Sequence, residues 1–125
     1  MNQVISCENA PAAVGTYSVA FKAGNTLYCS GQLGIDPSTG ELPNSVEAQV
    51  RQAFRNVFAI VEAAGGKPAD IVRQPVYLTD LANFAVVNKV MAEVFKAPYP
   101  ARSCVQISAL PKGGLVEVEA TAVIG

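Results

Sequence analysis

Two stretches with helical periodicity, set among runs of β-forming residues, constrain the fold of this chain most strongly. In the first stretch, apolar residues recur at the spacing of one helix face: Val50, Phe54, Val57, Val61 and Ala64. Ser45 is a good N-cap, and Glu47 suits the positive end of a helix. Gly65 is a typical stop signal. These residues predict a helix that starts after Ser45 and ends at Gly65.

A second amphipathic helix is predicted over residues 84–95. Its apolar face carries Phe84, Val87, Met91 and Phe95. Asn88 falls on that face, where a buried amide must find hydrogen-bond partners. Asn88 would then either tie the helix to a loop or reach a ligand pocket.

The remaining segments favour strands and loops. Residues 17–22 and 26–30 form a predicted hairpin that turns at Gly24-Asn25, and residues 31–44 form a loop. Further strands are expected over residues 71–79, 103–109 and 115–124. Pro75 cannot donate to a ladder, so it indicates an edge or a bulge.

The order ββαβαββ predicts a single α+β domain over residues 1–125, with a mixed sheet and two helices packed on one face. Half of the residues are hydrophobic and 15% are charged, against about a quarter charged in average domains. So few charges cannot cover a monomer, and a subunit interface is the usual place for surplus apolar surface. We therefore expect an oligomer.

Several functional classes are disfavoured by composition. The chain has no histidine, which excludes Ser-His-Asp and Cys-His catalysis and histidine-ligated zinc. A net charge of −1 without a basic run argues against nucleic acid as a partner. No segment has the pattern of a membrane span or a signal peptide. Three separated cysteines suit reduced thiols in the cytoplasm.

Arg102 and Cys104 are candidate site residues at the junction between a loop and a strand. A guanidinium holds a carboxylate through two hydrogen bonds, so Arg102 either binds an anionic ligand or pairs with a nearby acid of the protein. Cys104 lies two residues on, on the same strand face. It is either a small buried hydrophobe or a thiol whose ionisation the positive neighbour favours.

Glu117 and Glu119 project from the last predicted strand on the face opposite Val116 and Val118. They either form a solvated face or hold and deprotonate a water molecule. Tyr17 and Ser30 are expected to end the first two strands, and Gly31 would let the backbone approach a ligand closely.

Four stretches together resemble the Rid family of enamine and imine deaminases. They are NAPAAVGTYSVA, LYCSGQLGIDPSTGEL, VEAQVRQAFRNVFAIVEAAG and PARSCVQISALPKGGLVEVEATAV, of which the last is the most specific. The resemblance implies a homotrimer with a chorismate-mutase-like fold and active sites in the clefts between subunits. It also implies hydrolysis of 2-enamino or 2-imino acids, such as 2-aminoacrylate, to a 2-oxo acid and ammonia without metal or cofactor.

The resemblance also assigns roles to residues of this chain. Arg102 matches the family's carboxylate-binding arginine and Glu117 its water-binding glutamate. Substrate-pocket positions match Tyr17, Ser30, Gly31, Asn88 and Cys104. Thr16 departs from the proline that is common before the tyrosine.

Three other functions compete with the deaminase. A regulatory module that binds small carboxylates without turnover would use the same Arg102. A ribonuclease or translation inhibitor would need basic surface, which the charge disfavours. A chaperone-like role for the apolar surface would not need Arg102.

Overall fold

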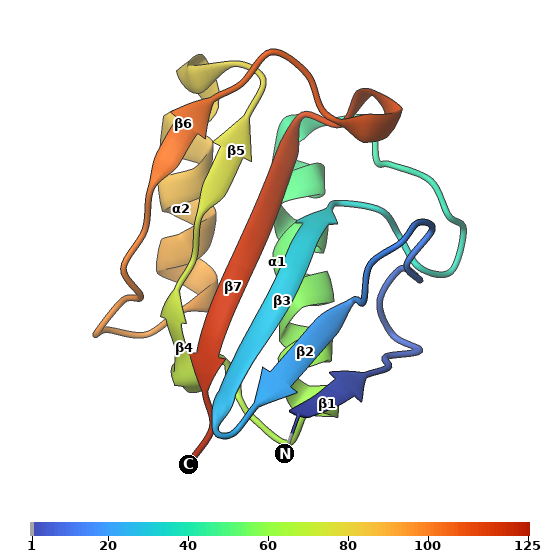
Figure 1. Cartoon of the computed structure of the whole chain (residues 1–125). Coiled ribbons are helices and arrows are strands. Elements are labelled where there is room, and N and C mark those ends of the chain that lie inside the picture. Colours follow the sequence, from blue (N-terminus) through green and yellow to red (C-terminus); the bar gives the residue numbers. More distant parts are fainter. Residues whose placement is uncertain (1) are drawn as a thin grey trace.

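The computed structural model describes residues 2–125 and contains one mixed sheet (Figure 1). The strands are β1 Asn2–Ile5, β2 Ala20–Ala23, β3 Thr26–Leu33, β4 Ile71–Arg73, β5 Val76–Leu78, β6 Cys104–Gln106 and β7 Val116–Val123. The helices are α1 Val46–Ala63 and α2 Phe84–Val94, with 3-10 turns at Pro68–Asp70, Leu81–Asn83 and Pro111–Gly113. This arrangement confirms the α+β class.

The long strands β3 and β7 lie next to each other, and the sheet runs β1-β2-β3-β7-β5-β6. β4 and β5 pair with successive parts of β7, and the chain between them breaks at Gln74 and Pro75. The predicted strand 71–79 is therefore two short strands, because proline cannot continue the ladder. β5 and β6 are parallel, whereas the other pairs are antiparallel, so the sheet is mixed as expected.

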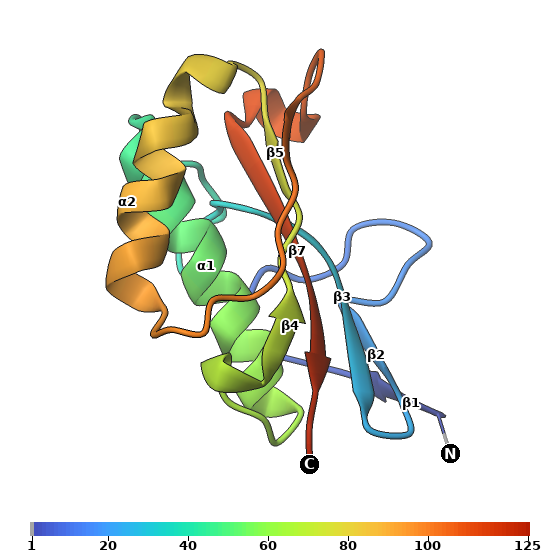
Figure 2. The ribbon, with the colours of Figure 1, turned by 90° about the vertical axis from the view of Figure 1, so that its left-hand side faces the viewer.

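Both helices cover the same side of the sheet, and the loop before β2 projects on the other side (Figure 2). The hydrophobic core lies between the helices and the sheet. Its fully buried side chains include Phe54, Val57, Leu27, Val116 and Val118. The alternating burial along β7 confirms that Val116, Val118, Ala120 and Ala122 face the helices, while Glu117, Glu119 and Thr121 face the open side.

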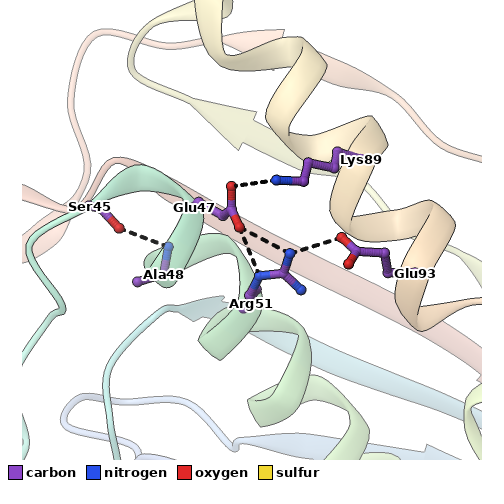
Figure 3. Close-up of polar contacts among 6 residues, drawn as sticks. All are labelled: Ser45, Glu47, Ala48, Arg51, Lys89 and Glu93. Carbon is purple, nitrogen blue, oxygen red and sulfur yellow. Dashed lines mark hydrogen bonds and ion pairs between the residues drawn. The ribbon is translucent and has the colours of Figure 1, made fainter.

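The start of α1 is capped as predicted, since Ser45 Oγ accepts a hydrogen bond from the Ala48 amide at 3.1 Å. Polar contacts also join the two helices on their outer surface (Figure 3). Glu47 accepts from Lys89 at 3.1 Å and from Arg51 at 3.0 Å, and Arg51 reaches Glu93 on α2 at 2.8 Å. These charges are solvent-accessible, so salt will screen their contribution to stability.

One strand was not predicted, and several boundaries differ from the sequence expectation. β1 was not predicted, since it is a short edge strand with three exposed residues out of four. β3 continues to Leu33, so the predicted loop 31–44 begins too early, and β2 begins at Ala20 instead of residue 17. The predicted strand 103–109 is limited to Cys104–Gln106, which pair only with the short β5.

Within residues 2–125, no helix combines the length and the apolar composition that are needed to cross a lipid bilayer.

Candidate functional site

Arg102 lies beside α2, where three side chains of that helix fix its guanidinium. Nη1 donates to Asn88 Oδ1 at 2.5 Å and lies 3.5 Å from the Met91 sulfur. The guanidinium carbon stands 5.0 Å from the centre of the Phe84 ring, a cation–π distance. A cavity of about 400 Å³ opens here, lined by Asn88, Met91, Ala92, Tyr99, Pro100 and Arg102.

No carboxylate among residues 2–125 forms a salt bridge with Arg102. Of the two alternatives for this residue, pairing with an acid of the protein is therefore not observed in the described chain. The guanidinium is half-buried and keeps donors free for an anion that enters the cavity.

Asn88 is exposed in the single chain, so the expectation that it is buried on the apolar face of α2 is wrong. Phe84, one turn earlier, is also 38% exposed. The core takes only Val87, Val90 and Met91 from this helix. The amide does reach a ligand-sized cavity, because it accepts from Arg102 at the cavity wall.

Cys104 is half-buried at the start of β6 and packs against the core. Burial raises the pKa of its thiol, and Arg102 offsets only part of that effect. The neutral thiol therefore predominates at neutral pH, which suits a wall of the site better than a nucleophile.

The second group of candidates lies on the open face of the sheet. A depression of about 650 Å³ is lined there by Tyr17, Ser30, Gly31, Glu117 and Glu119, among others. A smaller apolar cavity of about 390 Å³ adjoins it and shares Tyr17, Gly31, Pro111 and Glu117. Glu117 therefore borders both spaces.

Gly31 on β3 packs directly against the Glu117 carboxyl group. A Cβ atom at Gly31 would lie 2.7 Å from Glu117 Cδ and 2.8 Å from Oε1, closer than real Cβ contacts. Only glycine leaves room for the carboxyl group in this place. Burial, followed by the negative charge of Glu119, raises the pKa of Glu117, which makes it a stronger base than an ordinary glutamate.

Ser30 and Tyr17 do not end strands as expected, since Ser30 lies inside β3 and Tyr17 in the loop before β2. Ser30 Oγ donates to the Ser18 carbonyl at 2.6 Å, and its amide donates to Val19 O at 2.9 Å. The Tyr17 hydroxyl accepts from the Val14 amide at 3.4 Å. These contacts hold the loop that carries Tyr17, with Thr16 exposed within it.

The single chain does not bring all the candidates together. Cys104 is in register with Val76 and Val118, which face the helices, whereas Glu117 is in register with Tyr77 on the open face. β5 separates β6 from β7, so the strands that carry Cys104 and Glu117 are about 10 Å apart. Arg102, Asn88 and Cys104 thus form one half-site, and Tyr17, Ser30, Gly31 and Glu117 form another.

Sequence reasoning missed the polar residues that support the second half-site. Asn56, fully buried on α1, donates from Nδ2 to the carbonyls of Leu33 and Ile35, at 3.0 and 2.9 Å. Gln49 accepts from the Leu115 amide at 2.9 Å, next to β7. The available signal was a pair of amide side chains inside an otherwise apolar helix pattern.

Neither half-site offers an evident metal centre. Among the residues that the structure describes, no group of three or more Cys, Asp or Glu side chains could hold a metal ion.

The comparisons with known proteins each cover nearly the whole chain and point to one family. The 2-iminobutanoate/2-iminopropanoate deaminase of Escherichia coli K12 is 48% identical over 126 residues, covering 98% of each chain. The crystal structure of RidA from the Antarctic bacterium Psychrobacter sp. PAMC 21119 is 56% identical, with a TM-score of 0.96 and coverage of 98% and 99%. E. coli TdcF with bound serine is 42% identical, with a TM-score of 0.95 over 98% and 99% of the two chains. The family model described as Endoribonuclease L-PSP matches residues 7–124, and the resemblance to Rid proteins is confirmed: this chain belongs to that family.

Proposed function

We propose that this chain is a deaminase that hydrolyses 2-imino acids, and their 2-enamino tautomers such as 2-aminoacrylate, to 2-oxo acids and ammonia. The activity for which the E. coli relative is named, at 48% identity over nearly the full length, supports the reaction. The observation in this chain that carries the proposal is a half-buried Arg102 with no acid partner among residues 2–125, at the wall of a cavity.

Arg102 is proposed to bind the substrate carboxylate. A guanidinium presents paired N–H donors that match the two oxygens of a carboxylate. Asn88 and Phe84 hold the group in place, which reduces the entropy lost when the ligand binds. The bound serine of the TdcF structure, which also carries a carboxylate, supports a small amino-acid-like ligand in this family.

Glu117 is proposed to act as the base. It accepts a proton from water as the water oxygen forms a bond to the carbon of the protonated imine, and the C=N π electrons move to nitrogen. The proton then passes to the nitrogen of the carbinolamine, and Glu117 accepts the remaining hydroxyl proton as the C–N bond breaks, the C=O bond forms and ammonia leaves. The raised pKa of Glu117 suits both proton transfers. The iminium carbon is already electrophilic, so orientation and one base are sufficient chemistry.

The complete site is proposed to form between copies of the chain in a homotrimer. The two half-sites lie on different sides of the sheet in one chain, so a second copy must supply one of them. The open face also exposes apolar side chains that such a copy would cover, among them Phe21, Tyr28 and Val105. Three free thiols support a reducing compartment such as the cytoplasm.

A coupled assay tests the proposal. A serine or threonine dehydratase releases its enamine in the presence of semicarbazide, and the purified chain competes for the imine. We expect less semicarbazone and faster formation of 2-oxo acid, with loss of both effects in Arg102→Ala. Binding of a 2-oxo acid without any diversion of flux would instead identify a non-catalytic carboxylate-binding module.

A further inference from the structure

Glu119 and Tyr77 form a polar pair beside Glu117 that the proposed mechanism does not use. Glu119 follows Glu117 by two residues on β7, so the two carboxylates share the open face about 7 Å apart along the strand. The Tyr77 hydroxyl donates to Glu119 Oε1 at 3.0 Å. Both glutamates line the depression that also contains Tyr17 and Gly31.

We propose that Glu119, oriented by Tyr77, is a positioning residue whose fixed negative charge keeps Glu117 ready to accept a proton from the attacking water. This inference rests on the proposed function, because it assigns a partner to the base of that reaction. Glu119 itself touches neither the water nor the substrate in this proposal.

The contacts of Glu119 hold its charge in one place. Tyr77 is opposite Glu117 in the β5–β7 register and yet gives its hydrogen bond to Glu119. That hydrogen bond, followed by burial, raises the pKa of Tyr77, so the phenol keeps its proton and continues to donate. The backbone of Glu119 is anchored too, because its amide donates to Pro75 O at 3.0 Å and its carbonyl accepts from Gln74 Nε2.

The charge of Glu119 acts on Glu117 in a definite direction. A neighbouring negative charge disfavours ionisation, and its effect adds to burial in raising the pKa of Glu117. Other polar groups face this region from different elements: Tyr17 from the loop before β2, Tyr28 from β3, Lys112 from the turn before β7, and Arg73 from β4 beside Tyr77. None of these four groups is acidic, whereas Glu119 is, and it lies on the same strand as the proposed base Glu117.

The test combines a titration with a pH–rate profile on the full-length protein. Carboxyl carbons of ¹³C-labelled glutamate are titrated by NMR, and kcat/KM is measured across the acid range. Glu119→Gln keeps an acceptor for Tyr77 and removes the charge. We expect the titration of Glu117 and the acid limb of kcat/KM to move together to lower pH. Glu119→Asp, which restores the charge, should move both back toward the wild-type positions.

The matched control is Glu62→Gln, which removes the same charge from an exposed position on α1. It should leave both curves unchanged. A Glu119→Gln protein with the wild-type titration and the wild-type acid limb overturns the inference. Glu117→Gln distinguishes failure of the proposed base from failure of the Glu119 inference. If Glu117→Gln retains full turnover, Glu117 is not the base. If it is inactive and Glu119→Gln shifts neither curve, only the role of Glu119 is wrong.

Discussion

Arg102 and Asn88 are joined side chain to side chain, with Nη1 of the arginine 2.5 Å from Oδ1 of the amide. This hydrogen bond fixes the Arg102 guanidinium at the cavity wall and leaves its positive charge unneutralised. Arg102→Ala should therefore lower kcat/KM by about 100-fold or more, since hydrogen bonds to charged groups contribute about 1.5–3 kcal/mol each.

Arg102→Lys should recover only part of that loss, because lysine keeps the charge but lacks the planar fork. Arg55→Ala, at an exposed arginine of α1, is the control and should behave as wild type. Circular dichroism should show both Arg102 variants folded. Full activity in Arg102→Ala would remove the arginine from the site.

The Asn88 side chain is uncharged, and we expect this property to matter for substrate binding as much as its hydrogen bond to Arg102 does. Asn88→Asp would place a carboxylate against Nη1 and give Arg102 a salt-bridge partner, which it does not have among residues 2–125. That carboxylate would compete with the substrate, so KM should rise by about tenfold or more, and by more than in Asn88→Ala. Steady-state kinetics on a series of imino acids measures the difference. Equal KM values for the two variants would show that the charge at this position is irrelevant.

The absence of a side chain at Gly31 is what gives Glu117 its position. Gly31→Ala would bring a carbon to 2.7 Å from Glu117 Cδ, so the carboxyl group must move. Small displacements of catalytic groups are costly, and we expect kcat to fall by about 100-fold while KM changes little. Gly24→Ala is not a fair control because its φ is +59°. Gly125→Ala is better, since its added carbon would meet nothing within 4 Å.

Cys104 is expected to line the site without reacting. Its pKa is raised mainly by burial, and the chain has no histidine that could activate it. Cys104→Ser should keep most of the activity, within about threefold of wild type, because serine preserves the size of the side chain. Mass spectrometry after turnover should find no adduct on the thiol. A Cys104→Ser protein as inactive as Arg102→Ala would indicate a covalent mechanism.

The sequence predicted the fold where local signals and packing agree. The cap at Ser45, the apolar face of α1 and the alternation along β7 each follow from short-range periodicity. β1 was not predicted because this edge strand buries only one residue and so leaves no alternating pattern. Pro75 indicated an edge or a bulge, but the division into the two short strands β4 and β5 was not predicted.

The site was harder to predict, because its contacts are long-range. Asn88 looked buried from the pattern of α2, yet its partner is Arg102, 14 positions away in the loop before β6. Similarly, the pair of Tyr77 and Glu119 joins residues 42 positions apart and leaves no periodic trace in the sequence. Both pairings depend on how segments far apart in the sequence pack together, which local periodicity does not specify.

The last prediction concerns the assembly of the site from two copies. Arg102 contacts α2 on the helix side of the sheet edge, whereas Glu117 faces the open side, with β5 between their strands. If each active site takes Arg102 from one copy and Glu117 from the next, Arg102→Ala and Glu117→Gln trimers should each be nearly inactive. Mixed trimers formed by refolding or co-expressing the two variants should contain some sites with both native residues.

Random mixing at equal amounts leaves one site in four intact, so about a quarter of the wild-type activity should return. Light scattering would establish the trimer, and two differently tagged subunits would allow mixed species to be isolated before the assay. Mixing without exchange of subunits is the control and should restore nothing. Mixed trimers that stay inactive would mean that both residues must come from the same copy, and a stable monomer at micromolar concentration would exclude a site between subunits.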